Sequence, residues 1–229
     1  MKLYLISTVA FFFLFAICGF VFAEPSFNGP SGLIITPTAD ITTPESAWLG
    51  ASYIDYSNSG VNSSLWSYTL TGGISENFEI GVAGFYSSSA SDGFGLNAKY
   101  AVMLEGEETP GISVGLIYND MSGDSVTNFY IVGSRYFQAD DLNVDRAVGI
   151  HGGIGWLDAS WVNDEFNYWG GLDFNIADDM IAIAEYTSTF GPTDNDVFAF
   201  GIRYFANDIW SGQAGLVDGD LTIGASFIF

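Results

Sequence analysis

The alternating pattern of this sequence is cleanest in its last nine residues, Leu221-Thr222-Ile223-Gly224-Ala225-Ser226-Phe227-Ile228-Phe229. The odd positions are all apolar, whereas the even positions are Thr, Gly, Ser and a single Ile. The same alternation runs from Phe198 to Tyr204 and from Phe94 to Val102. Because side chains of a β-strand point alternately to its two faces, a period of two predicts strands with one apolar and one small or polar face.

This pattern recurs along most of the chain, between clusters of Gly, Asn, Asp and Ser. The expected strands cover 46–56, 64–74, 78–87, 94–103, 111–121, 126–137, 146–157, 165–176, 180–189, 196–206, 209–217 and 220–229. A tilted strand needs ~9–11 residues to cross a membrane, and an up-and-down barrel commonly has an even number of strands. Asp218-Gly219 is a type I′ hairpin signal. The sequence therefore predicts an all-β fold, a transmembrane antiparallel up-and-down barrel of about twelve strands over residues 46–229.

A soluble β-sandwich is the alternative, since its strands also alternate. Its outer face would be rich in charged residues, yet only 14% of the 229 residues are charged and 17% are aromatic. Aromatic residues such as Trp48, Tyr168 and Trp210 also gather near the strand ends, as in the interfacial girdles of membrane barrels. With 27 acidic and 5 basic residues and one Cys, the chain fits neither nucleic-acid binding nor a disulfide scaffold. These features favour the barrel.

Residues 1–23 are expected to form a cleaved signal peptide. Lys2 precedes the apolar stretch from Leu3 to Val21, and Val21-Phe22-Ala23 loosely fits a small-x-small cleavage site. An uncleaved anchor helix and lipidation at Cys18 are the alternatives, and the residues before Cys18 do not suit the latter. Export through a signal peptide and a barrel together predict the outer membrane of a bacterial cell, with membrane lipid as a partner.

The chain's final strand carries a second clue to this location. Phe227 and Phe229 share one face at the carboxyl terminus. This ending resembles the last strand by which bacterial outer-membrane barrels are recognised. The resemblance implies that the barrel assembly machinery is a partner and that both phenylalanines belong to its assembly signal.

Charged residues in the strands are few, and their parity predicts where they point. The inward-facing set comprises Glu79, Lys99, His151, Asp173, Glu185, Arg203 and, provisionally, Arg135, which shares the parity of Phe129, Ile131 and Phe137. A lipid-facing charge at mid-membrane costs about 2–4 kcal/mol, which favours the inward choice. Two interpretations stay open. The set forms either a salt-bridge network that stiffens a narrow barrel or a constriction that selects solutes by charge. The remaining acidic residues fall mainly in the connections and form two rims.

No catalytic, cofactor or metal motif is recognised. There is one His and no Cys after residue 23, and neither Gly-x-Ser-x-Gly nor a phosphate-binding loop occurs. One imidazole without a second His is not a metal site. His151 with Ser134 or Ser160 leaves a membrane-embedded hydrolase as a remote hypothesis.

Residues 24–45 hold four of the six prolines, which predicts a periplasmic loop or plug because proline has no N–H for a sheet ladder. Within it, Gly29-Pro30-Ser31-Gly32-Leu33-Ile34-Ile35-Thr36-Pro37-Thr38-Ala39-Asp40 resembles the opening motif of the YjbH-like family. Glu76-Asn77-Phe78-Glu79-Ile80-Gly81 is similar to that family's first periplasmic turn. The resemblance implies an outer-membrane barrel linked to exopolysaccharide or capsule production, with polysaccharide-export components as partners. Members of that family are much longer than this chain.

The sequence leaves alternatives both for the position of residues 29–40 and for the function of the protein. Residues 29–40 either cap the periplasmic mouth or fold into the lumen as a gate, since Leu33-Ile34-Ile35 requires burial. The leading functional hypothesis is an envelope scaffold associated with surface-polysaccharide export. A narrow passive channel for small solutes is the second hypothesis, and the hydrolase is the third.

Overall fold

The computed structural model describes residues 23–56, 63–89, 92–121, 124–138, 148–159, 162–189 and 196–229. The expected signal peptide, Ala23 excepted, lies outside these ranges, as does Ser160. In the described part of the chain, no helix is long and apolar enough to cross a membrane.

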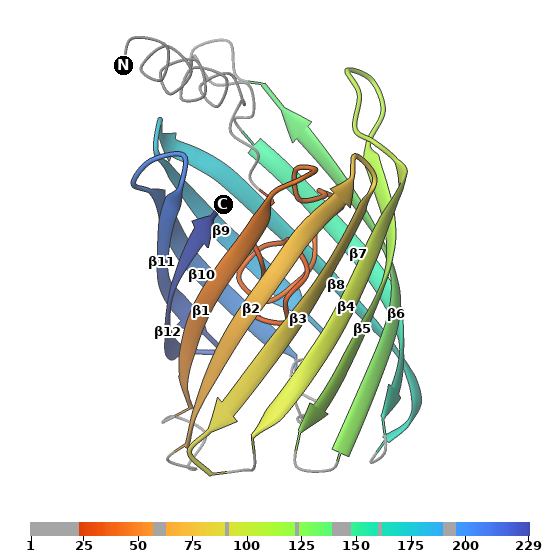
Figure 1. The fold of residues 1–229 in the computed structure, drawn as a ribbon, viewed down its shortest axis with the longest axis vertical. Helices are drawn as coiled ribbons and strands as arrows, with labels where there is room; N and C mark the ends of the chain where they lie inside the picture. The colour runs from red at the N-terminus through yellow and green to blue at the C-terminus, as the bar shows by residue number, and fades with distance from the viewer. Residues whose placement is uncertain are drawn as a thin grey trace, which may run out of the picture.

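Twelve strands form a closed antiparallel barrel (Figure 1), as predicted from the alternation. Each strand pairs with its neighbours in sequence, and β1 pairs with β12. The strands are β1 (Ala47–Tyr56), β2 (Ser63–Ser75), β3 (Phe78–Ser87), β4 (Gly93–Met103), β5 (Gly111–Met121), β6 (Asp124–Phe137), β7 (Val148–Ala159), β8 (Val162–Ala177), β9 (Met180–Thr187), β10 (Val197–Phe205), β11 (Trp210–Val217) and β12 (Asp220–Ile228).

The first and last strands close the barrel. Trp48 lies opposite Ile228 and Ile54 opposite Thr222. At the chain end, Ala47 and Phe229 exchange two backbone hydrogen bonds of 2.9 and 3.0 Å. The end of the barrel at Ala47 and Phe229 is called the terminal rim below, and the opposite end is called the far rim. Asp218 and Gly219 form a turn at the far rim with φ angles of 53° and 86°, as a type I′ hairpin requires.

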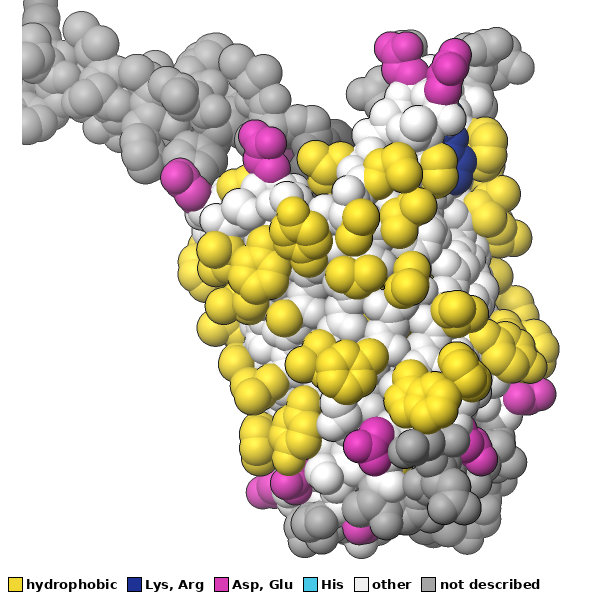
Figure 2. Space-filling view, turned by 90° about the vertical axis from the view of Figure 1, so that its right-hand side faces the viewer, with side chains coloured by type: hydrophobic (Ala, Val, Ile, Leu, Met, Phe, Trp, Pro, Cys, Tyr) yellow, Lys and Arg dark blue, Asp and Glu magenta, His cyan; other side chains and the backbone are white. Residues whose placement is uncertain are grey.

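The two faces of the wall differ as the alternation predicts. On β6, the outward Phe129 and Ile131 are 58% and 52% exposed, whereas the inward Tyr130 and Val132 are 3% and 0% exposed. Figure 2 shows apolar side chains spread over the outer wall and acidic side chains toward both rims. This arrangement leaves a broad apolar surface that water does not favour and that a bilayer would cover.

The N-terminal segment lies inside the barrel, where Figure 1 shows it as a coiled trace within the ring of strands. Residues 24–42, called the plug below, are buried almost throughout. Leu33, Ile34 and Ile35 are at most 2% exposed and form one apolar cluster with Phe27 and Phe85. Of the two placements considered for residues 29–40, the structure therefore shows the one in the lumen.

Candidate functional site

The plug has a compact shape held by its own backbone. Ser26 N donates to Pro30 O (2.7 Å), Gly32 N to Glu24 O (2.7 Å) and Leu33 N to Thr36 O (2.9 Å). Gly29 has a φ of +107°, a conformation that residues with a side chain rarely adopt. The plug is thus a series of tight turns, and its remaining polar groups face the barrel wall.

A buried ion pair from β3 and β4 binds the centre of the plug. Glu79 and Lys99 lie opposite each other in the sheet, 3.1 Å apart, and both side chains are 0% exposed. The Glu79 carboxylate accepts from Ser31 N (3.0 Å), Ser31 Oγ (2.7 Å) and Thr42 N (2.8 Å). Lys99 Nζ donates to Ser31 O (2.8 Å) and Thr38 O (3.1 Å). Because buried charges are costly unless hydrogen bonds satisfy them, the plug groups that bind Glu79 and Lys99 stabilise this pair, and the pair in turn holds the plug.

A second charged contact comes from β9 and β10. The Glu185 carboxylate accepts from Ile35 N (2.8 Å), Thr36 N (3.0 Å) and Thr36 Oγ1 (2.5 Å). Arg203 donates to Leu33 O (3.0 Å), and its Nε lies 2.8 Å from Glu24 Oε2. The two wall residues thus hold the plug backbone by its N–H groups and its carbonyls.

His151 connects two wall residues near the terminal rim. Its Nδ1 lies 2.8 Å from Ser134 Oγ and its Nε2 2.8 Å from Asp173 Oδ2. Ser134 Oγ also accepts from Ala39 N (2.8 Å). In a neutral imidazole this assigns the proton to Nε2, with the Ser134 hydroxyl donating to Nδ1. The chain Asp173–His151–Ser134 therefore ends on the plug backbone.

This triad of side chains does not have the geometry of a serine hydrolase. In such enzymes the acid contacts Nδ1 and the nucleophile contacts Nε2, and the opposite holds here. Ser134 is 3% exposed, and the plug amide of Ala39 occupies its oxygen. The arrangement attaches the plug to the wall through Ser134.

Arg135 does not belong to the lumen, and the provisional inward assignment was wrong. It shares the outward face of β6 with Phe129, Ile131 and Phe137. Its guanidinium donates to the carbonyls of Gly106 (2.5 Å), Thr109 (2.9 Å) and Glu107 in the β4–β5 connection. The cost of an outward charge is avoided because the long side chain reaches the terminal rim, where these carbonyls replace water.

The outward position of Arg135 leaves the lumen with one base fewer than the inward set named from the sequence. Only Lys99 and Arg203 remain as basic residues of the described inner wall. The acidic residues of the lumen are Glu79, Asp173, Glu185 and Asp220 on the strands, with Glu24 and Asp40 in the plug. The described lumen therefore carries an excess of negative charge.

Sequence reasoning missed several plug contacts made by small or aromatic wall residues. Ser67 Oγ donates to Phe27 O (2.6 Å), Ser113 Oγ to Ala39 O (2.7 Å) and Trp169 Nε1 to Pro37 O (3.1 Å). The alternation predicts that these side chains point inward, but it does not distinguish a residue that binds the plug from one that only fills the lumen. The plug therefore has hydrogen-bond partners on β2, β5 and β8 as well.

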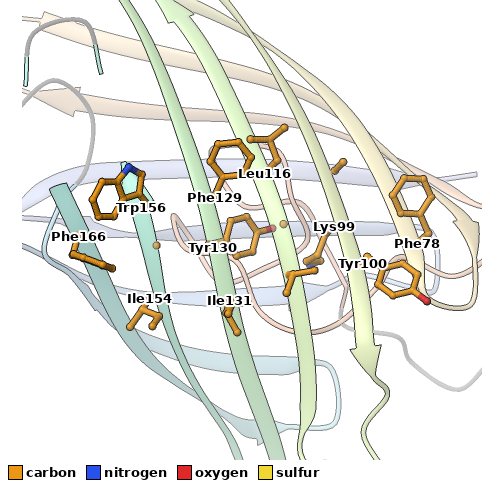
Figure 3. A pocket seen from close by; sticks show the side chains of 14 residues that line it. Phe78, Lys99, Tyr100, Leu116, Phe129, Tyr130, Ile131, Ile154, Trp156 and Phe166 are labelled. Carbon is orange, nitrogen blue, oxygen red and sulfur yellow. The ribbon is translucent and has the colours of Figure 1, made fainter. Parts of the chain in front are cut away.

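An apolar depression lies on the outer wall across β3 to β8 (Figure 3). Leu116, Phe129, Trp156 and Phe166 are among its lining residues, and Phe166 is 70% exposed. Within the described ranges, no group of three or more His, Cys, Asp or Glu is arranged to hold a metal ion.

The fold is shared with solved outer-membrane porins at low sequence identity. The KdgM porin, solved in complex with disordered oligogalacturonate, is 13% identical over 80% of this chain and 98% of that chain, with a TM-score of 0.60. The NanC porin (13% identity, 79% and 98% coverage) gives 0.55, and Omp33 of Acinetobacter baumannii (12%, 80% and 98%) gives 0.54. No protein-family model and no curated protein sequence matches the chain. The chain thus has the twelve-stranded barrel architecture of these porins.

Proposed function

We propose that the protein is a porin-like channel of the bacterial outer membrane whose lumen is closed by its own N-terminal plug. The single observation that carries the proposal is the burial of residues 24–42 inside a closed barrel, where hydrogen bonds, ion pairs and one apolar cluster attach them to the wall. Polar contacts of this kind exchange with water at modest net cost, roughly 0.5–1.5 kcal/mol for each neutral bond. We infer that the plug opens the lumen by exchanging these polar contacts for water, with the apolar cluster around Leu33 to Ile35 as the larger cost of movement.

The porin architecture supports a channel more than the scaffold role that was our leading hypothesis. The resemblance of residues 29–40 to the YjbH-like family, and with it the link to polysaccharide export, remains a proposal without a matching family model. We place the expected signal peptide before the plug, the terminal rim in the periplasm and the apolar wall in lipid. Catalysis is not part of the proposed function.

A reversible lock on the plug tests the channel. A Cβ at Gly111 would lie 3.5 Å from Cβ of Ala39, a separation typical of disulfides. The chain has no Cys after residue 23, so A39C/G111C would form a single defined bridge. In planar bilayers we expect the oxidised variant to stay silent and the reduced variant to open as the unmodified protein does. Deletion of residues 24–42 should give steady openings.

Two results would overturn the proposal. Equal conductance of the oxidised and the reduced A39C/G111C variant would show that ions pass while the plug stays in place. Silence of a plug-deleted barrel that still migrates as a heat-modifiable folded band would favour the scaffold role.

A further inference from the structure

Several side chains on the inner wall carry polar atoms without a hydrogen-bond partner among the described residues. They are Asn97 on β4, Asn119 on β5, Asn128 and Tyr130 on β6, and Asn167 on β8. The four asparagines are called the asparagine arc. All four lie toward the far rim, and the arc borders the plug, because Asn119 Nδ2 donates to Asn28 Oδ1 at 3.5 Å. Five side chains with unpartnered atoms on four strands between β4 and β8 are unusual, since buried polar groups are nearly always satisfied.

The register makes the arc continuous. Asn97 and Asn128 both lie opposite Ile117, one on each side of β5. Asn167 lies opposite Gly155, which in turn lies opposite Tyr130. The side chains therefore occupy adjacent positions on one curved surface of the wall.

Two of the amides converge on one point. A Cβ placed on Gly155 would collide with Oδ1 of Asn128 and with Oδ1 of Asn167. The two oxygens both lie over Gly155, close enough together for one hydroxyl-bearing ligand to reach both. Asn167 is 5% exposed, and its Oδ1 receives no hydrogen bond from any described group. Each such orphan acceptor costs roughly 1–3 kcal/mol, which a donor from a ligand would recover.

The chemistry of the arc selects an uncharged ligand rich in hydroxyls. An asparagine amide has two donor hydrogens and an acceptor oxygen but no charge. The buried ion pairs of the lumen, Glu79 with Lys99 and Glu24 with Arg203, are engaged at the plug. A ligand that both donates and accepts at every position, such as a neutral oligosaccharide, matches amides that each offer both functions.

We propose that the asparagine arc binds a neutral oligosaccharide in the lumen between the plug and the far rim. The amides of Asn128 and Asn167 turn from Gly155 toward the ligand hydroxyls, and the Tyr130 hydroxyl supplies a further donor. This binding site rests on the proposed channel in one respect, because the oligosaccharide must be able to enter the barrel.

Equilibrium titration calorimetry of the purified mature barrel in detergent tests this site without requiring conduction. The probes are maltohexaose, which is neutral, and oligogalacturonate, which is acidic. We expect maltohexaose to bind and oligogalacturonate to bind at least about tenfold more weakly. N128L/N167L should weaken maltohexaose binding about tenfold or more, a change of roughly 1.4 kcal/mol. Asn175→Leu is the matched control, because Asn175 lies on the same strand and inner-face parity as Asn167 but near the terminal rim.

The outcomes separate this inference from the channel. Heat-modifiable migration first establishes that each variant is folded. Any of three results would overturn the site. The barrel does not bind maltohexaose, or it binds oligogalacturonate equally well, or N128L/N167L and the Asn175→Leu control lose maltohexaose affinity equally. A channel that conducts in bilayers would survive any of these results, whereas maltohexaose binding by a barrel that never conducts would reject the channel and retain the site.

Discussion

Single charged residues of the barrel wall bind the backbone of the plug. Glu185 is the clearest example, because one carboxylate accepts two amide N–H groups and one hydroxyl from the plug. Glu79 has the same role on the other side of the lumen. A carboxylate suits such positions because it has no hydrogens of its own to oppose the donors.

Glu185→Gln should loosen the plug. The amide replaces one acceptor oxygen with a donor that faces plug N–H groups, so we expect a loss of roughly 1–3 kcal/mol in plug binding. The measured consequence is a higher open probability in planar bilayers at unchanged single-channel conductance. Glu45→Gln removes the same charge from an exposed residue outside the plug and should behave as the unmodified protein does. An unchanged open probability in Glu185→Gln would show that this carboxylate does not retain the plug.

At the scale of elements, β12 has two tasks that fall on different faces. Its inward face, including Thr222 at 1% exposure, closes the lumen against β1. Its outward face ends in Phe227 and Phe229, whose ring centroids lie 5.8 Å apart, with Phe227 also packed on Trp210 at 4.7 Å. The phenylalanines thus form a small aromatic cluster at the terminal rim.

F227S/F229S should reduce the amount of folded barrel in the outer membrane. The expected reason is loss of the terminal strand's recognition during assembly, in addition to loss of apolar surface. Quantitative gels of heat-modifiable protein from isolated membranes measure the effect. Leu221→Ser alters the same face of the same strand at the far rim, where Leu221 is 52% exposed, and should assemble nearly normally. Equal loss in both variants would assign the effect to hydrophobicity alone.

The whole molecule combines acidic rims, an apolar wall and a lumen with more carboxylates than bases. After removal of the plug, the described inner wall keeps Glu79, Asp173, Glu185 and Asp220 against Lys99 and Arg203. A pore of this charge attracts cations and repels anions, because side-chain charges act strongly in a narrow channel.

The plug-deleted barrel should therefore prefer K⁺ over Cl⁻. Reversal potentials under a KCl gradient measure this preference, and E79Q/E185Q in the same background should weaken it toward zero. Raising the salt concentration should reduce it further, since the Debye length falls to ~3 Å at 1 M. A reversal potential of the opposite sign would show that the described acidic residues do not set the field of the pore.

The barrel, the strand number and the face to which most residues point could all be predicted from the amino-acid sequence. Each of these follows from a local period of two, so Glu79, Lys99 and Arg203 could be placed inward without any knowledge of their partners. Arg135 was misplaced because parity alone cannot tell that a long side chain at a strand end reaches the rim. Only the tertiary structure decided the position of the plug, since Leu33 to Ile35 needed burial but could find it at the mouth or in the lumen. The contacts of Glu185 with Thr36 and of Ser134 with Ala39 join residues roughly a hundred or more positions apart, and no local pattern encodes such pairs.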